Sequence, residues 1–329
     1  MSDLKYVADL RPNDRVSGFF RISSIQVKET RDGRPYLDLK LKDKTGEIPA
    51  KVWDYGEGGE FEKGDFVAVA GQVELYQDAP QLVLKRIRRV TEEDRAYGFE
   101  EARFEERTSY DVETMWSDLV AIGETLSPPL RDLVLGLLLD HREAFYRAPA
   151  SQYHHHPFLG GLLEHTLSVT RTCLYLAEKY PVCRDLLVGG AMIHDIGKVK
   201  ELSFEGETDY TISGRLIGHI IQGRDLVREK AKGLVDFPEE DLLELEHLLL
   251  SHQGRSEWKS PALPQTLEAL VLHYADDLDA KVNMVRRAVE RDPGAEPFTP
   301  RHRALERQLY KTPLLRELER RGESSTGGE

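Results

Sequence analysis

Cysteine and long apolar runs are both scarce in this chain. Its 329 residues include two cysteines, Cys173 and Cys183, too few for a disulfide framework, and we expect both to be reduced core or near-core thiols. The longest strongly apolar run, Leu133 to Leu139, is too short to cross a bilayer. Met1 to Lys5 lack the basic and apolar regions of a signal peptide. We therefore expect a cytoplasmic protein with no membrane partner.

An excess of basic residues is also absent. The formal net charge of −13 argues against a protein that coats nucleic acid over its whole surface. Residues 1–90 carry 16 Lys+Arg and 15 Asp+Glu, a net of +1, whereas the remainder carries 29 and 43, a net of −14. A near-neutral N-terminal module can hold a polyanion through local basic positions. The acidic remainder would need a metal or a focused patch to do so.

The N-terminal residues have the composition of short β-strands. Leu37, Leu39 and Leu41 face one way in the expected alternation, while Tyr36 and Lys40 face the other. Five such strands in about 75 residues predict a small closed barrel. The expected strands cover residues 15–28, 36–43, 47–54, 65–76 and 81–90.

From Asp111 onward the apolar period becomes that of helices. The preceding stretch, residues 91–110, is highly charged and is expected to be a linker. The end of the chain, residues 313–329, is expected to be a disordered tail because Gly, Ser and Glu dominate its last ten positions. The expected helices cover residues 111–126, 129–145, 162–180, 184–194, 217–232, 239–251 and 265–290.

Two histidines and two aspartates carry the strongest chemical signal. His165, the pair His194-Asp195, and Asp276 lie in three separate apolar segments. Ionised carboxylates are almost never buried without a partner, and a metal ion would supply one. A lone histidine is most often a hydrogen-bonded core or surface residue. Two imidazoles and two carboxylates inside a helical bundle together predict a divalent metal site.

These segments resemble the HD superfamily of metal-dependent phosphohydrolases. The chain contains His194-Asp195-Ile196-Gly197-Lys198 and then Ala275-Asp276-Asp277, in the order in which the superfamily has its motifs. The resemblance implies two metal ions that share Asp195. The ligands that it implies for the first ion are His165, His194, Asp195 and Asp276, and those for the second are Asp195, His219 and His252. For His219 and His252 the alternative is a polar residue at a helix end.

Two neighbouring cations can hold a hydroxide between them, lower its pKa and clamp phosphate oxygens, so no Ser or Cys nucleophile is needed. Mixed nitrogen and oxygen ligands suit Mn²⁺, Fe²⁺, Co²⁺ or Zn²⁺ better than Mg²⁺ alone, and we expect Mn²⁺. We assign catalytic roles to Asp195 and to Lys198, which could offset charge on the scissile phosphate. His155 and His156 are expected to line the cleft and contact substrate, with a polar loop as the alternative.

The N-terminal barrel resembles an OB-fold of the nucleic-acid-binding kind over Tyr36 to Ile48, Ala50 to Trp53 and Gly64 to Gly71. Strand alternation places aromatic and basic side chains on its outer face, where they would form a stacking platform for single-stranded bases. The alternative is that the aromatics cover a seam against the helical domain. The expected platform residues are Phe19, Arg21, Tyr36, Lys40, Lys51 and Trp53.

An OB-fold followed by an HD domain resembles the YhaM-type 3′→5′ exoribonucleases over residues of about 10 to 310. Gly160 to Thr166, Gly218 to Ile220 and Glu257 to Pro261 add to the likeness. It implies a multidomain α and β protein, with an OB-fold barrel in residues 1–90 and an all-α HD domain in residues 111–312.

The activity implied by this resemblance is metal-dependent 3′→5′ hydrolysis of single-stranded RNA, with DNA left open. The direction of attack rests on the resemblance alone. Two departures stand out: Gln253, where family members often carry a second His, and Lys259, where they often carry Gly. Gln253 would weaken the second metal site if that position binds metal, and would change specificity if it contacts substrate.

Three other functions stay open at this point. The chain could be an HD-type nucleotide or cyclic-dinucleotide phosphohydrolase whose barrel serves regulation or assembly. It could also be a nucleic-acid-binding protein with a degenerate metal site, or a two-iron oxygenase, since HD-type bundles can hold two irons. The sequence does not decide whether the chain forms a homo-oligomer.

Overall fold

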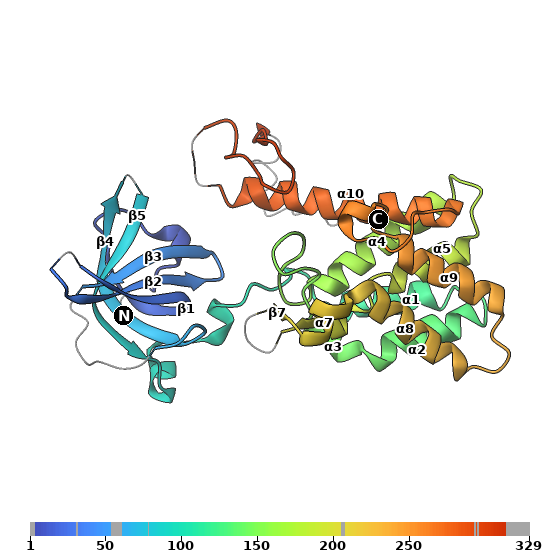
Figure 1. The fold of residues 1–329 in the computed structure, drawn as a ribbon, viewed down its shortest axis with the longest axis horizontal. Coiled ribbons are helices and arrows are strands. Elements are labelled where there is room, and N and C mark those ends of the chain that lie inside the picture. The colour runs from blue at the N-terminus through green and yellow to red at the C-terminus, as the bar shows by residue number, and fades with distance from the viewer. Residues whose placement is uncertain are drawn as a thin grey trace. The chain divides into compact units, whose positions relative to one another are not determined.

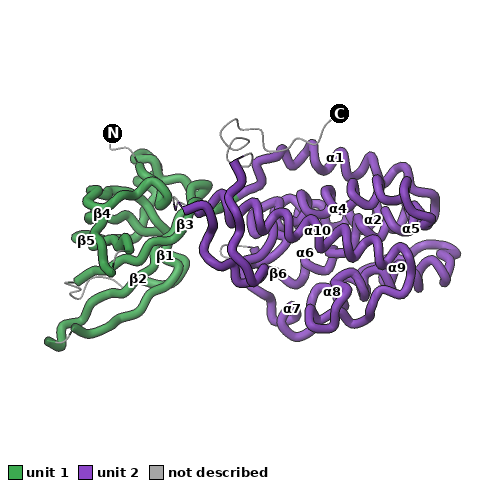
Figure 2. Tube along the Cα trace, turned by 90° about the horizontal axis from the view of Figure 1, so that it is seen from above, with its two compact units in different colours: residues 1–106 green, residues 107–329 purple. Residues whose placement is uncertain are grey.

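The computed structural model describes residues 4–30, 32–53, 61–77, 79–204, 208–292, 294 and 296–313. The chain divides into two compact units, residues 1–106 and residues 107–329 (Figure 2). Residues 314–329 of the expected tail lie outside the described residues. None of the described helices combines the length and the apolar character that crossing a membrane would require.

Five strands close into a barrel in the first unit (Figure 1). The strand order is β1-β2-β3-β5-β4, and the pairing of β3 with β5 is parallel while the other pairings are antiparallel. This is the predicted OB-type barrel. Its strands are β1 (Arg15–Glu29), β2 (Pro35–Asp43), β3 (Gly46–Val52), β4 (Phe66–Tyr76) and β5 (Ala79–Arg89).

Alternation along the strands builds the barrel core. Leu37, Leu39 and Leu41 of β2 are fully or almost fully buried, as their spacing predicts. Gly71 sits at the irregular pairing of β4 with β5, where a Cβ atom would lie 2.3 Å from the carbonyl oxygen of Val83. Only glycine allows the two backbones to approach this closely, so Gly71 helps to close the barrel.

The segment expected to be a linker is instead folded onto the barrel over residues 91–106. Asp94 is buried and accepts two hydrogen bonds from the Arg88 guanidinium at 2.6 and 2.7 Å. Phe99 and Phe104 bury their rings, and both pack against Phe66 of β4. Two aromatic residues within a charged stretch supply this anchor. The short 3₁₀ helices here are η2 (Glu92–Tyr97) and η3 (Glu101–Arg103), and η1 (Val7–Asp9) precedes the barrel.

Helices make up the second unit, and their apolar faces form one large core cluster. Several short elements were not expected: a ribbon of two-residue strands, β6 (Leu202–Ser203) and β7 (Asp209–Tyr210), the helices α6 (Lys198–Glu201) and α7 (Ile212–Ile217), and the 3₁₀ turn η4 (Ser256–Trp258). The helices are α1 (Val112–Gly123), α2 (Leu130–Asp140), α3 (Arg142–Arg147), α4 (Gly161–Ala177), α5 (Arg184–Ile193), α6, α7 (Ile212–Ile217), α8 (His219–Lys232), α9 (Glu239–Ser251) and α10 (Leu267–Glu290), with a 3₁₀ turn η4 (Ser256–Trp258).

Two helix boundaries differ from the expected ones. The expected helix over residues 129–145 is interrupted at His141, which separates α2 from α3. Gly218 has φ 80° and ψ 157° and separates α7 from α8, so that α8 begins at His219. A left-handed φ of this kind favours glycine. The break makes His219 the first residue of α8, two positions after the expected helix start.

Candidate metal centre

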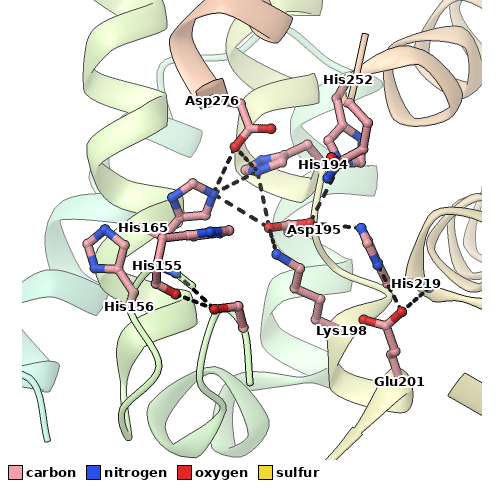
Figure 3. Close-up of polar contacts among 12 residues, drawn as sticks. His155, His156, His165, His194, Asp195, Lys198, Glu201, His219, His252 and Asp276 are labelled. Atoms are coloured by element: carbon pink, nitrogen blue, oxygen red, sulfur yellow. Dashed lines mark hydrogen bonds and ion pairs between the residues drawn. The ribbon is translucent and has the colours of Figure 1, made fainter. Parts of the chain in front are cut away.

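Three packed helices bring the four leading candidate ligands together. His165 lies on α4, His194 and Asp195 directly follow α5, and Asp276 lies on α10. All four are buried, and their side chains converge in Figure 3. Because α5 ends at Ile193, His194 and Asp195 lie in the turn that follows it, where both side chains are buried.

The converging atoms have the spacing of ligands around one ion. His165 Nε2 lies 3.1 Å from Asp276 Oδ1, 3.3 Å from His194 Nε2 and 3.5 Å from Asp195 Oδ2. His194 Nε2 lies 3.4 Å from Asp195 Oδ2 and 3.8 Å from Asp276 Oδ1. Two donors bound to one ion at roughly 2.1 Å are about 3.0 to 3.4 Å apart, so a small contraction would complete the site.

A second set of atoms surrounds the other oxygen of Asp195. Its Oδ1 lies 3.4 Å from His219 Nε2 and 3.7 Å from His252 Nε2. Asp195 Oδ1 and His219 Nε2 are buried and have no hydrogen-bond partner. Buried polar atoms without a partner are rare and costly. A cation between these atoms would satisfy them, so the residues fit a second metal ion that shares Asp195.

All four histidines are oriented through their Nδ1 atoms. In each case Nδ1 faces an oxygen, which can only accept, so Nδ1 is a donor and Nε2 is the nitrogen directed at the pocket, where it can bind a metal once it carries no proton. The partners of Nδ1 are Asp279 Oδ2 for His165 (2.7 Å), the Ala191 carbonyl for His194 (2.8 Å), Glu201 Oε1 for His219 (3.0 Å) and the Leu249 carbonyl for His252 (2.8 Å).

Two of these oxygens belong to carboxylates whose roles the sequence did not establish. Asp279 accepts from His165 and from Ser168 Oγ, and Glu201 accepts from both the ring and the backbone N–H of His219. Asp279 follows Asp276 by three positions on α10, and this spacing places both on one helix face. No comparable signal existed for Glu201, because the turn between Asp195 and His219 had no predicted path.

The pocket has a surplus of negative charge. Burial lowers the pKa of His165, but Asp276 and Asp279 outweigh it and raise the pKa to about 10. Burial alone would raise the pKa of Asp195, but Lys198 and His194 hold it well below its usual value. Lys198 is itself buried, and its Nζ lies 2.5 Å from Asp195 Oδ2. Lys198, the expected catalytic lysine, therefore forms an ion pair with an oxygen of Asp195 that is a candidate metal ligand.

His155 and His156 have different surroundings in the structure. The ring of His155 lies 4.9 Å from that of His165, and its Nε2 is buried without a partner beside the candidate ligands. Burial holds the pKa of His155 well below its usual value, so the ring is neutral. His156 instead contacts Asp279 at 3.1 Å and Glu164 at 3.3 Å. His155 thus points at the pocket, whereas His156 belongs to the network behind His165.

The expected platform on the barrel is only partly assembled. The rings of Tyr36 and Trp53 are 4.9 Å apart, and the Lys51 ammonium lies 4.9 Å from the first and 5.7 Å from the second. Lys51 also pairs with Asp38 at 3.1 Å. Lys40 is exposed on the same face of β2, because it follows Asp38 by two positions. These four outward groups share one side of the barrel with Asp38 and with Glu47, which lies 3.8 Å from Lys40.

Phe19 and Arg21 lie apart from that face. In the strand register Arg21 pairs with Lys42, whereas Tyr36 pairs with Lys28, so the two ends of β2 are about 20 Å apart. The Phe19 ring packs against Phe99 at 5.6 Å, and the Arg21 side chain is buried and donates to the carbonyl of Gly64. The alternation correctly placed both side chains outside the barrel. It could not show that Phe99 would pack on Phe19, or that Arg21 would fold onto Gly64 and the Phe66 ring.

Comparisons with known proteins cover both units. Residues 162–281 match the HD domain family, and residues 21–90 match the OB-fold nucleic acid binding domain family. The 3′-5′ exoribonuclease YhaM of Bacillus subtilis (strain 168) is 37% identical over 309 residues, which cover 92% of this chain and 96% of the relative. The YhaM of Listeria monocytogenes serotype 4b (strain F2365) is 35% identical over 94% of this chain and 99% of its own.

The chain belongs to the YhaM family of 3′-5′ exoribonucleases. The HD domain of this family and the clustered histidines and aspartates together indicate that the chain binds a divalent metal. A solved OB-fold domain of replication protein A from Methanococcus maripaludis matches 27% of this chain and 95% of its own, at 22% identity and a TM-score of 0.23. A score this low adds nothing to the family assignment.

Proposed function

We propose that the chain is a metal-dependent 3′→5′ exonuclease that hydrolyses single-stranded RNA, and also single-stranded DNA, with two Mn²⁺ ions. The arrangement around Asp195 carries this proposal. Its two oxygens face two separate sets of imidazole nitrogens, and one of the oxygens is buried without a partner. A shared carboxylate between two ions is suited to phosphodiester hydrolysis.

The proposed ligands keep the assignments made from sequence. His165, His194 and Asp276 would hold the first ion with Asp195, and His219 and His252 would hold the second with it. When bound, such a pair of cations lowers the pKa of water and withdraws charge from phosphate oxygens. The histidines can serve because their Nδ1 protons are already committed to oxygen atoms, which leaves each Nε2 to bind the ion once it carries no proton.

Other residues of the pocket would act on the substrate directly. Lys198 carries the positive charge closest to Asp195 and would turn toward a non-bridging phosphate oxygen as the strand binds. His155 is neutral, and its unpartnered Nε2 would donate a hydrogen bond to the phosphate if the proton sits there. The name of the curated relatives supports the exonuclease over the nucleotide phosphohydrolase.

The barrel would hold the strand while the helical unit cleaves it. Tyr36 and Trp53 offer ring faces to successive bases, and Lys40 and Lys51 offer charge to the backbone. Base stacking on aromatic rings tolerates any sequence, as a general exonuclease requires. We propose residues 1–90 as the binding domain and residues 111–312 as the catalytic domain.

Timed digestion of 5′-labelled RNA and DNA oligomers with Mn²⁺, with Mg²⁺ and without metal tests the activity. We expect a ladder that shortens from the 3′ end and depends on added metal. Asp195→Asn should abolish cleavage, because the variant removes the charge that both ions share, yet retain strand binding through the barrel. An Asp195→Asn variant that digests RNA at the normal rate would remove the basis of the site assignment. Cleavage of mononucleotides or cyclic dinucleotides, with none of oligomers, would instead support the alternative enzyme.

A further inference from the structure

A short closed loop follows the metal-ligand candidate His252, and none of the roles assigned above uses it. Gly254 has φ 72°, and a Cβ atom there would lie 2.2 Å from the ring of His273, so the chain turns hard against α10. The backbone N–H of Ser260 donates to the carbonyl of Arg255, and its buried hydroxyl donates to the carbonyls of Leu250 and Ala262. The loop is therefore fixed in place rather than loosely attached.

This loop presents a tryptophan beside two cations. The Arg255 guanidinium lies 4.8 Å from the centre of the Trp258 ring, and the Lys281 ammonium of α10 lies 5.4 Å from it. The His273 ring is tilted against the indole, with 6.2 Å between the centroids. Even so, 38% of Trp258 remains exposed. An exposed indole beside Arg and Lys is the arrangement that stacks bases and holds phosphates in single-strand binding sites.

The local charge also differs from that of the surrounding unit. Arg255, Lys259 and Lys281 outnumber the nearby carboxylates of Glu257 and Asp277, in a chain whose net charge is −13. Within the part of the chain that the structure describes, Arg255 forms no ion pair, whereas Lys281 pairs with Asp277 at 2.6 Å. A positive excess on an acidic protein marks a place where a phosphate can approach.

The cluster is tied to the second candidate metal set. His273, which lies against Trp258, directs its Nδ1 at the carbonyl of His252 at 2.9 Å. Gly254, where the loop turns, follows His252 by two positions. The loop therefore begins directly at a candidate metal ligand.

We propose that Trp258, Arg255 and Lys281 form a subsite for the nucleotide next to the scissile phosphodiester, with the base on the indole and its phosphate on the two cations. This proposal rests on the proposed nuclease function. It adds a second stacking position, next to the chemistry and separate from the barrel. The subsite would favour an oligomer over a small diester, because only an oligomer has a further nucleotide to place there.

Comparing two substrates tests the subsite. We expect Trp258→Ala to lower kcat/KM on an RNA oligomer about tenfold to hundredfold more than on bis(p-nitrophenyl) phosphate, and Trp258→Phe to recover most of that difference. Tyr175→Ala is the matched control, because Tyr175 is an exposed aromatic with Lys179 5.2 Å from its ring but lies elsewhere, on α4. It should lower neither substrate selectively. Equal losses on both substrates for Trp258→Ala would overturn the proposal.

Fluorescence provides a readout that needs no catalysis. In an Asp195→Asn, Trp53→Phe background only Trp116 and Trp258 remain, and Trp116 is buried. We expect an RNA oligomer to quench the emission, Trp258→Phe to remove the quenching, and Arg255→Ala to weaken binding and flatten its salt dependence. Unchanged emission would overturn the subsite and leave this surface to a protein partner. If the unmutated enzyme cleaves neither substrate, the proposed function fails, while the quenching still decides the subsite.

Discussion

Asp279→Asn is the substitution that best tests how the pocket is supported. The Asp279 carboxylate accepts from His165 Nδ1 at 2.7 Å, lies 3.1 Å from His156 Nε2 and accepts from Ser168 Oγ. Burial would raise the pKa of this carboxyl, but hydrogen bonds from His156 and His165 hold it well below its usual value. It is therefore an ionised acceptor for several donors at once. Asn keeps the shape but replaces one accepting oxygen with an N–H donor.

The expected loss follows from that mismatch. With Asn, either His165 or its neighbours would face an N–H group, so the imidazole would no longer be held with Nε2 toward the metal. Losing such a supporting carboxylate typically costs 10- to 100-fold in metal affinity or activity, about 1.4 to 2.7 kcal/mol. The loss should fall on the first ion, because the second set contains neither His165 nor Asp276.

Calorimetric titration of the metal-free protein with Mn²⁺ is the appropriate assay, since it separates two classes of sites. We expect one class, the one that includes His165, to weaken 10- to 100-fold in Asp279→Asn and the other to stay within about twofold. Asp118→Asn is the control, because Asp118 pairs with Arg171 on an exposed surface and should leave both classes unchanged. If Asp279→Asn binds both ions as tightly as the parent protein, Asp279 does not support His165 and the inferred orientation of the ring through Nδ1 is wrong.

Two further substitutions test the frame around the site and the barrel face. Gly197→Ala should destabilise the protein by roughly 3 kcal/mol in urea unfolding, because the new Cβ would lie 1.9 Å from the carbonyl oxygen of His219. Gly189→Ala, which meets only side-chain carbons at 3.4 Å or more, should be tolerated, and equal stability of the two variants would contradict this reasoning. Replacing Tyr36 and Trp53 together by Ala should weaken binding of single-stranded RNA by about 1 to 3 kcal/mol per base lost from the stack. Unchanged binding in a filter or anisotropy assay would show that this face does not carry the strand.

The regular parts of the fold were predictable because their patterns are local. Leu37, Leu39 and Leu41 alternate with polar residues, and this spacing alone defines the buried face of β2. The helices that carry His165 and Asp276 were likewise predicted from their period. The prediction failed for segments whose sequence combines many charged residues with a few aromatic ones. Residues 91–106 are highly charged, yet a few aromatic residues decide where they pack, as Phe99 and Phe104 do on Phe66.

The candidate metal ligands could be predicted from sequence motifs, whereas the residues that hold the ligands in place could not. The resemblance to the HD superfamily implied that His165, His194 and Asp276 share one metal ion, and in the structure their ligand atoms lie within 4.8 Å of one another. Glu201 could not be predicted, because its contact with His219 depends on the break at Gly218 and on the short helix α6. His156 was expected to contact substrate, but its partners come from Asp279 and Glu164, on separate helices.

The distribution of charge makes entry of a phosphate depend on the metal. Asp195 and Asp276 supply carboxylates to the pocket, Asp279 and Glu201 supply them to its histidines, and Lys198 is paired with Asp195 (Figure 3). Without a divalent cation this pocket would repel a phosphodiester, and the net charge of the residues after position 90 would add to the repulsion. Two divalent ions would reverse the sign locally. We therefore expect metal binding to control entry of the phosphate into this pocket as well as its cleavage.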